Sequence, residues 1–189
     1  MTNDFDTRRY VERWFWTLAQ LAEAVGATRG ETERLIAAGC GPGPSYVAAA
    51  DGWWSALDAP ERSRPAGEAW YSPAAAWGLR RARKAIRGGA TPAEAAAANL
   101  GRFERDFAAA LARHSLAPVA FAHCFVDGQV EAVAVSAAAA AEWQGWLLGG
   151  YGVCLRVFTG ETCVAKESLG ATMKAALSTG EGDPAILLD

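Results

Sequence analysis

The sequence predicts an α+β fold, in which a helix-turn-helix-like pair of helices at the N-terminus precedes a small three-stranded sheet packed with further helices. Two observations predict it: two short amphipathic segments that flank a glycine turn near the N-terminus, and a hairpin motif at Asp127-Gly128 that is followed by one more strand-like segment. Because the helical segments come first and the strands later, rather than in alternation, the pattern is typical of α+β proteins. Three parts are predicted: a helix-turn-helix-like region at 1–47, a Trp-rich ordered connector at 48–78 and an α+β body at 79–189.

The helix-turn-helix is predicted from capping residues and apolar spacing. Thr17 begins a short helix in which apolar residues recur at positions i, i+3, i+4 and i+7, and Gly26 ends it. Thr28 begins a second helix, and Glu31 three residues later completes a capping box. Gly39 ends that helix, so two short helices joined by a tight turn are expected.

The connector at 48–78 shows little periodicity but many large side chains. It contains three prolines and five aromatic residues, namely Trp53, Trp54, Trp70, Tyr71 and Trp77. Exposing so many rings to water costs free energy. We therefore expect an ordered, irregular segment that packs across another part of the chain.

The body begins with two predicted helices. Residues 74–88 carry an apolar stripe surrounded by Arg and Lys, and residues 91–113 open with the start signal Thr91-Pro92-Ala93-Glu94. The basic cluster at residues 80–87 is predicted to be a solvated helix face, with contact to phosphates or to an acidic partner as the alternative.

The predicted sheet is built on a hairpin. Strands 119–126 and 129–136 flank Asp127-Gly128, a dipeptide typical of two-residue hairpin turns. Alternation along the first strand places His123 on the core face and Cys124 on the opposite face. An Ala-rich helix beginning at Ser136, a third strand at 151–158 and a last helix over residues 161–178 complete the body.

Composition and charge limit the function classes. The 189 residues are 51% hydrophobic and carry a net charge of −3, which fits a globular chain without a global positive field for nucleic acid. The four cysteines form no CxxC pair and the N-terminus has no apolar signal segment, so we expect a cytoplasmic protein with reduced thiols. The uncharged stretch 143–155 is too short to cross a bilayer, so no membrane contact is expected.

Two resemblances follow from these motifs. Residues 17–39 resemble the helix-turn-helix of the MerR and excisionase type. A second resemblance, to a bacterial family of unknown function whose members are labelled natural-product biosynthesis proteins, rests on four segments: 44–47, 51–54, 146–156 and Lys166-Glu167. Its most distinctive part is Tyr151-Gly-Val-Cys-Leu-Arg156, and it implies no catalytic residue. Gly160 stands where the family pattern has a proline after Thr159.

The helix-turn-helix makes Arg29 and Arg34 candidates for DNA contact, because its second helix would enter a major groove. Glu31 and Glu33 on the same helix cancel their charge, and residues 1–47 contain five Arg against six Asp and Glu. DNA-binding proteins neutralise several phosphates with Lys and Arg. Charge therefore disfavours DNA as a partner, and it favours a degenerate module that packs on the aromatic segment.

Eight residues are candidates for ligand binding: Trp53, Trp70, His123, Tyr151, Cys154, Arg156, Cys163 and Lys166. Indole rings can wall a pocket for a flat metabolite, although core filling between Ala-rich helices is the interpretation we favour for most of the Trp residues. Cys163 lies near the start of a helix, where the dipole favours a thiolate, and Lys166 lies on the same face, although most cysteines are inert small apolar residues.

No residue is predicted to be catalytic, and no metal or cofactor is predicted. His123 and Cys124 point to opposite faces of the predicted strand, so one metal ion could not bind both without distortion. Motifs of dinucleotide-binding proteins, P-loop proteins, zinc proteases and serine hydrolases are absent from the sequence.

The sequence favours a non-catalytic binding or regulatory protein, whose partner is an unidentified small molecule or protein. One alternative is an accessory enzyme or substrate-binding protein of natural-product biosynthesis, with a site near Tyr151, Cys154, Arg156 and Lys166. The others are a DNA-binding transcriptional regulator and a scaffold with a purely structural head. Internal pairing of Arg29 and Arg34 with Glu31 or Glu33 would argue against DNA binding, and a homodimer is left open.

Overall fold

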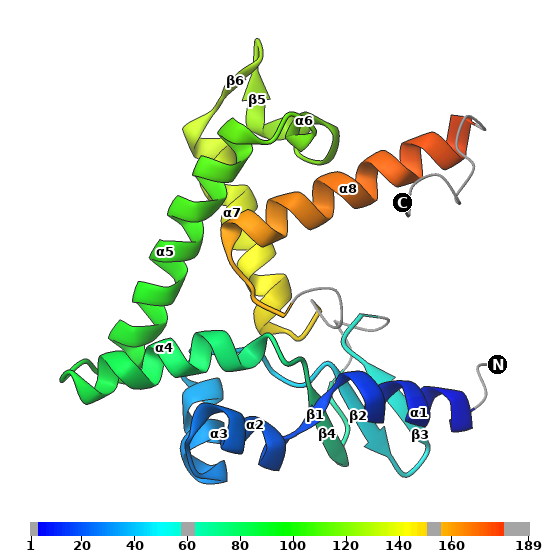
Figure 1. The fold of residues 1–189 in the computed structure, drawn as a ribbon, viewed down its shortest axis with the longest axis vertical. Coiled ribbons are helices and arrows are strands. Elements are labelled where there is room, and N and C mark those ends of the chain that lie inside the picture. Colours follow the sequence, from blue (N-terminus) through cyan, green and yellow to red (C-terminus); the bar gives the residue numbers. More distant parts are fainter. Residues whose placement is uncertain (1–3, 58–62, 151–155, 180–189) are drawn as a thin grey trace. The chain divides into compact units, whose positions relative to one another are not determined.

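The computed structural model describes residues 4–57, 63–150 and 156–179, and it divides into two compact units. The first unit comprises residues 1–101 and 143–158, and the second comprises residues 102–142 and 159–189. Within the described residues the chain forms eight α-helices, a 3₁₀ helix, a four-stranded antiparallel sheet and a two-stranded hairpin (Figure 1). The α+β prediction is confirmed. The division of the chain into parts 1–47, 48–78 and 79–189 stays a prediction.

The elements of the first unit are α1 (Asp4–Trp14), β1 (Trp16–Thr17), α2 (Leu18–Val25), α3 (Arg29–Ala37), β2 (Tyr46–Ala49), β3 (Gly52–Ser55), β4 (Glu68–Tyr71) and α4 (Ala75–Arg87). The second unit holds α6 (Ala117–Ala120), the 3₁₀ helix η1 (Ala122–Cys124), β5 (Phe125–Val126), β6 (Gln129–Val130) and α8 (Gly160–Thr179). Helices α5 (Pro92–Arg113) and α7 (Ala132–Leu147) contribute residues to both units.

Helices α2 and α3 form the predicted helix-turn-helix. Thr17 caps α2 through a reciprocal box, in which Gln20 N donates to Thr17 Oγ1 at 3.3 Å and Thr17 N donates to Gln20 Oε1 at 2.8 Å. Gly26, at φ 67°, ends α2 in the left-handed conformation. Thr28 caps α3 by accepting from Glu31 N at 3.1 Å, which confirms this half of the predicted capping box. The Glu31 carboxylate pairs with Arg83, and a hydrogen bond from the Thr28 backbone also lowers the pKa of this carboxyl.

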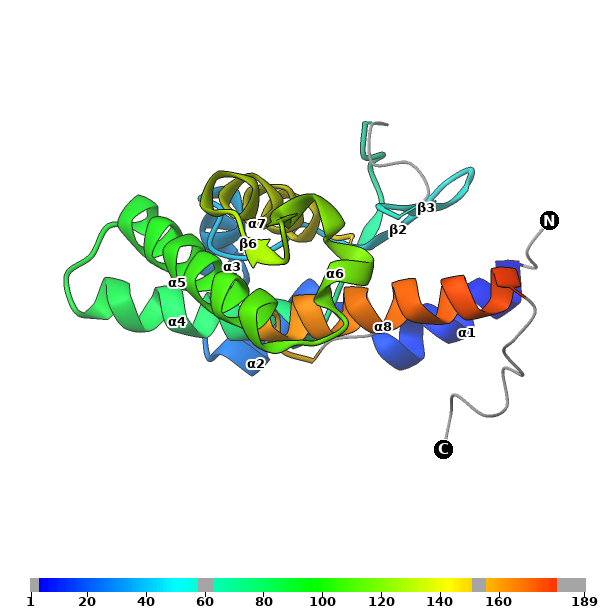
Figure 2. The same ribbon diagram turned by 90° about the horizontal axis from the view of Figure 1, so that it is seen from above.

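The four-stranded sheet arises where an irregular segment was predicted. Strand β2 pairs with β3, in the register Val47↔Trp54, and with β4, in the register Tyr46↔Trp70. Strand β1 completes the order β1-β4-β2-β3. The sheet lies next to α2, and β3 is its far edge (Figures 1 and 2). The described residues of the connector, 48–57 and 63–78, therefore include three strands and are not irregular as predicted. Strands of two to four residues are too short to show a period of two.

The predicted three-stranded sheet of the body is wrong. Its hairpin is reduced to β5 and β6 around the expected turn, in which Asp127 has φ 49° and Gly128 has φ 75°. Residues 119–124 belong largely to α6 and η1, and α7 begins at Ala132. Alanine favours helix over strand, and the Glu131 carboxylate caps α7 by accepting from Val133 N and Ala134 N. Residues 151–155 of the third predicted strand lie outside the described residues, and 156–158 form no strand.

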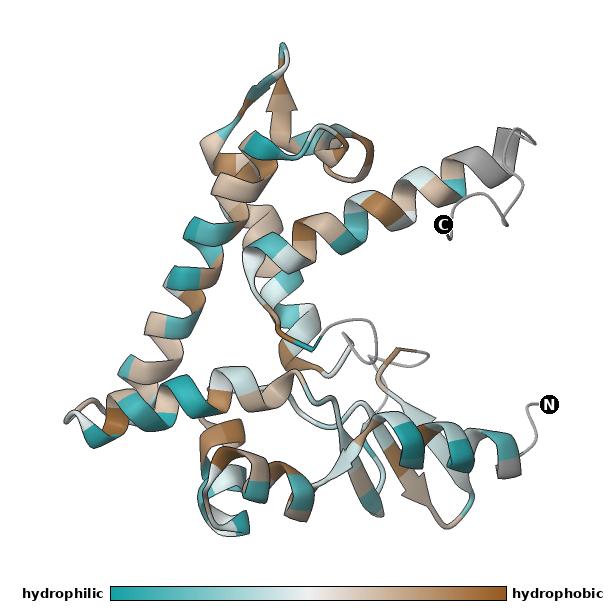
Figure 3. Cartoon of the chain, in the orientation of Figure 1, coloured by the Kyte–Doolittle hydropathy of each residue, from teal (hydrophilic) through white to brown (hydrophobic). Residues whose placement is uncertain are grey.

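The other predicted helices are confirmed. Helix α4 covers most of the predicted segment 74–88, and α8 covers the predicted segment 161–178. At the start of α5, Glu94 N donates to Thr91 Oγ1 at 3.2 Å and Thr91 N donates to Glu94 Oε2 at 2.7 Å, which is the predicted capping box. Hydrophilic and hydrophobic residues alternate along α4 and α5, as expected of amphipathic helices (Figure 3).

The core of the first unit joins the helix-turn-helix to α4. Leu21 and Leu35 from the helical pair pack with Leu79 of α4 and with Tyr71 of β4, all of them buried. Asn99, only 3% exposed, donates through Nδ2 to the carbonyl oxygens of Gly78 and Cys40 at 3.1 and 3.4 Å. A hydrogen-bonded amide in this position satisfies two buried carbonyl groups.

Candidate functional site

Helix α3 presents one continuous face to solvent. Thr32 and Leu35 are buried, whereas five residues of α3 are exposed: Arg29, Gly30, Glu33, Arg34 and Ala37. Their spacing of i, i+1, i+4, i+5 and i+8 places them on one side of the helix. We call these five residues the α3 face.

The charge of the α3 face is changed by a contact from α4. Arg83 Nε donates to Glu31 Oε1 at 2.8 Å, and its side chain is only 18% exposed. This guanidinium hydrogen bond is the main reason that the pKa of the Glu31 carboxyl lies below its ordinary value. Glu31 is thereby held against α4, and it is not one of the carboxylates of the α3 face.

Two arginines of α4 also complete the C-terminal end of α2. Arg80 donates through Nε and Nη2 to Ala24 O at 2.9 and 2.6 Å, and Arg83 Nη1 donates to Val25 O at 3.2 Å. The last carbonyls of a helix have no partner within the helix, and cations at that end interact favourably with its dipole. The predicted solvated face is therefore wrong for Arg80 and Arg83, which hold α4 to the helix-turn-helix.

Arg29 and Arg34 have no such partner. Within the described part of the chain, neither forms an ion pair or a side-chain hydrogen bond, and both are exposed. The internal pairing with Glu31 or Glu33 that would have argued against DNA contact is therefore not seen among the described residues. The α3 face carries two guanidinium groups and one carboxylate.

The negative charge of the chain lies mainly in the second unit. The first unit contains 13 Lys and Arg against 11 Asp and Glu, a net charge of +2, whereas the second contains 5 against 10, a net charge of −5. The net charge of −3 therefore does not describe the unit that holds the helix-turn-helix.

A pocket of about 400 Å³ adjoins the α3 face. Arg29 and Glu33 line it from α3, and Glu68 and Tyr71 line it from β4. Tyr71 is 7% exposed, and burial raises the pKa of its phenol. Because both carboxylates and a guanidinium group line this pocket, its lining does not favour a ligand of one charge over the other.

The two tryptophans named as ligand candidates lie elsewhere. Trp70 is buried and Trp53 is half-buried, and both pack against Val11 and Phe15 of the α1 region. Neither lines this pocket or the arginine-rich pocket described below. In the described residues they fill a core, which is the alternative that the sequence favoured for most of the Trp residues.

The remaining candidates of the first unit are only partly described. Tyr151 and Cys154 lie outside the described residues. Arg156 is exposed and lines a pocket of about 330 Å³ with residues of β1 and α4. Trp77 and Arg81 of this pocket are not among the predicted site residues. Arg81 belongs to the basic cluster at 80–87, for which contact with phosphates was the alternative, and Trp77 lies one helical turn before it.

In the second unit, Cys163 is fully buried and its thiol donates to Glu142 Oε2 at 3.6 Å. Burial and the neighbouring carboxylates of Glu142 and Glu167 raise the pKa of the Cys163 thiol, which is the reverse of the shift predicted from the helix dipole. Burial also raises the pKa of the Glu142 carboxyl. Lys166 Nζ lies 2.6 Å from Glu167 Oε1. The thiol is therefore protonated at neutral pH, which argues against the thiolate that the helix dipole would favour at Cys163.

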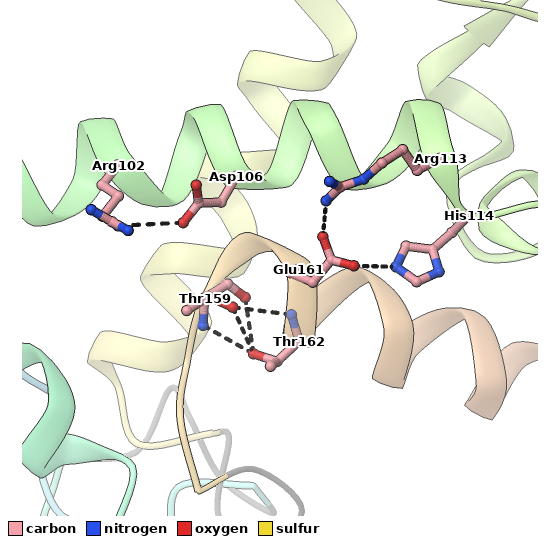
Figure 4. A network of polar contacts seen from close by, with 7 residues as sticks. All are labelled: Arg102, Asp106, Arg113, His114, Thr159, Glu161 and Thr162. Atoms are coloured by element: carbon pink, nitrogen blue, oxygen red, sulfur yellow. Dashed lines mark hydrogen bonds and ion pairs between the residues drawn. The ribbon is translucent and has the colours of Figure 1, made fainter.

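His123 is exposed on η1 rather than buried on a strand, so its predicted place on the core face is wrong. The reason is the helical conformation of residues 117–124, which abolishes the alternation of a strand. The other histidine, His114, belongs to the polar network of Figure 4. There His114 Nε2 lies 2.8 Å from Glu161 Oε1, and Arg113 donates to the other oxygen of the same carboxylate.

This network fixes the start of α8 to the end of α5. Thr162 N donates to Thr159 Oγ1 at 3.2 Å, and Thr159 N donates to Thr162 Oγ1 at 3.0 Å, so the first turn of α8 is capped (Figure 4). Arg102 and Asp106 form a separate pair along α5 at 3.6 Å. Each group has a structural partner, so the network is an anchor for α8.

The same described residues offer no metal cluster, no disulfide and no membrane-spanning helix. Across 4–57, 63–150 and 156–179, no group of three or more His, Cys, Asp or Glu could hold a metal ion. Cys40, Cys124 and Cys163 are buried free thiols. None of the helices described is long and apolar enough to cross a bilayer.

Comparison with known proteins gives one match. Residues 100–185 match the model of a family described as "Family of unknown function (DUF6058)". The match covers less than half of the chain and does not reach the helix-turn-helix, the sheet or α4. Searches of curated proteins and of solved structures found no match. A family of unknown function is thus supported for residues 100–185, and the link to natural-product biosynthesis stays a prediction.

Proposed function

We propose that this chain is a DNA-binding regulatory protein, whose helix-turn-helix places the α3 face in the major groove. The observation that carries the proposal is which charged side chains of α3 have partners and which do not. Arg29 and Arg34 are exposed and have no partner among the described residues, whereas Glu31 is held by Arg83.

The geometry suits this role. In helix-turn-helix proteins the N-terminal residues of the second helix contact base edges, and arginine is the commonest side chain that reads guanine. Arg29 is the first residue of α3, and Arg34 follows five residues later on the exposed side. The first turn of α3 also has backbone N–H groups that favour a phosphate.

The electrostatics predict modest affinity. A net charge of +2 on the first unit, with Glu33 still on the α3 face, allows only a few phosphate contacts. The logarithm of the binding constant should fall with the logarithm of salt concentration with a slope of about −0.9 per phosphate contacted. The second unit, with twice as many acidic as basic residues, would be repelled by DNA. We assign to it the contact with a protein or a small molecule.

The test is fluorescence anisotropy of the full chain with labelled random-sequence duplex, in a salt series that begins at low ionic strength. Arg34→Gln should weaken binding roughly 5- to 100-fold, the effect expected for one arginine that contacts a base. Arg105→Gln removes a positive charge that is also exposed, from α5 in the second unit, and it serves as the matched control. Circular dichroism of both variants checks the fold.

Two results would reject the proposal. One is the absence of binding at the lowest salt concentration. The other is an equal loss of affinity in Arg34→Gln and Arg105→Gln, because binding would then follow total charge and not the α3 face.

A further inference from the structure

The second pocket of the first unit joins aromatic rings to positive charge. It has a volume of about 330 Å³ and lies between β1, α4 and the segment that contains Arg156. Two indoles, three guanidinium groups and one proline line most of it: Trp16, Trp77, Arg80, Arg81, Arg156 and Pro73. No carboxylate is among the described residues that line it.

Among the described residues that line the pocket, no acid pairs with Arg80 or Arg156. Arg80 uses Nε and Nη2 to bind Ala24 O, and within the described residues its Nη1 has no protein partner. Arg156 is exposed and has no ion pair in the same part of the chain. Like charges brought into one pocket repel each other, and a bound anion would relieve that repulsion.

The aromatic lining selects the shape of that anion. The Arg81 guanidinium carbon lies 5.1 Å from the centre of the Trp77 ring, within the range of a cation–π contact. This contact orients a flat cation along a flat indole. Trp16 of β1, which is half-buried, supplies a second indole. Flat apolar walls beside guanidinium groups suit a ring that carries a carboxylate or a phosphate.

The volume of the pocket limits the size of the ligand. A volume of about 330 Å³ is at the lower end of the range of small-molecule sites. It suits a compound of one or two fused rings, and it is small for a dinucleotide. Neither Arg29 nor Arg34 lines this pocket, so the site is separate from the α3 face.

We propose that the pocket formed by Trp16, Trp77, Arg80, Arg81 and Arg156 binds a planar aromatic anion, with its ring against the indoles and its acid group on the guanidinium groups. This site goes beyond DNA binding and does not depend on it. Of its residues, Arg156 was a ligand candidate from the sequence, and Arg80 and Arg81 belong to the basic cluster for which contact with phosphates was the alternative.

The experiment is isothermal titration calorimetry of the full chain, without DNA, with four probes. These are 2-naphthoate, its neutral amide 2-naphthamide, 2-naphthyl phosphate and inorganic phosphate. The proposal expects 2-naphthoate or 2-naphthyl phosphate to bind at least about tenfold more tightly than the amide, because charge-assisted hydrogen bonds are about twice as strong as neutral ones. Whichever of the two binds more tightly identifies the acid group. Inorganic phosphate, which has no ring, should bind more weakly than both.

Arg156→Gln should weaken the tighter probe about tenfold, since it removes one charge-assisted hydrogen bond. Arg156 makes no ion pair in the described structure, so the variant should keep its fold. Arg9→Gln, an exposed change on α1 of the same unit, should leave the affinity unchanged. The proposal is overturned if neither aromatic anion binds at ~1 mM, if the amide binds as well as the acids, or if both arginine variants weaken binding equally.

Discussion

Gly160 is the position where one added carbon should have the largest effect on the second unit. It is the first residue of α8 and lies against the backbone of α5. A Cβ built on Gly160 would overlap the backbone nitrogen and Cα of Phe107. Because backbone atoms inside a helix cannot rotate away, Gly160→Ala requires the start of α8 to move away from α5.

The magnitude follows from the packing and from a control within the same helix. Overpacking a well-filled site costs about 1–3 kcal/mol, and a clash with backbone belongs at the upper end of that range. Gly170, also in α8, has open space for 4 Å around the position that a Cβ would take. Gly170→Ala should therefore stabilise the chain by up to about 1 kcal/mol, the difference in helix propensity. The two substitutions add the same atom and should have opposite signs.

Urea denaturation followed by circular dichroism at the helical band measures both variants. The midpoint should fall for Gly160→Ala and rise for Gly170→Ala. Gly160→Pro should also lower the midpoint, although proline is usually favoured in the first turn of a helix, because its Cβ meets the same backbone. A Gly160→Ala midpoint at or above that of the parent chain would refute the packing of α8 on α5.

Three further substitutions test single contacts by denaturation. Arg83→Gln should cost about 1–2 kcal/mol through its lost charged hydrogen bonds, with Lys84→Gln on the same helix as a neutral control. The pKa of Glu31 is lower in the folded state than in the unfolded state, so its ionised carboxylate stabilises the fold above the unfolded pKa. This stabilisation is lost as the pH falls through the folded-state pKa. In a pH series, the free energy of unfolding should therefore fall less toward acid pH in Arg83→Gln than in the parent chain. Gly128→Val should lower the thermal midpoint, because φ is 75° there and a β-branched residue costs about 1–2 kcal/mol; an unchanged midpoint would contradict the turn. Asn99→Leu should cost about 1–3 kcal/mol by removing two hydrogen bonds to buried backbone carbonyls, and a neutral result would mean that water replaces the amide.

The helices were predictable because their signals are local. Thr17, Thr28 and Thr91 each cap a helix from a position that the sequence alone identifies. Gly26 likewise ends α2 at a positive φ that favours glycine. Capping acts over three or four residues, so it needs no knowledge of the rest of the fold.

The sheet could not be predicted in this way, because its strands are defined by partners that are distant in sequence. β1 has only two residues, and it becomes a strand by pairing Trp16 with Tyr71. Conversely, residues 119–124 have the residue types of a strand, but no strand partner lies beyond Val130, since Glu131 caps α7. Alternation over a few residues is therefore a weak signal when helix capping competes with it.

The charge of the α3 face depends on a contact that no local count contains. Helix 29–38 has two Arg and two Glu, and its charge in the sequence is zero. Arg83 lies 52 residues from Glu31, and their pairing removes one carboxylate from the surface that α3 presents. The same contact stabilises the packing of α4 on the helix-turn-helix, so stability and DNA affinity should be linked through Arg83. Arg83→Gln should then lower both quantities, whereas Arg34→Gln should lower affinity alone, because Arg34 has no partner in the described structure.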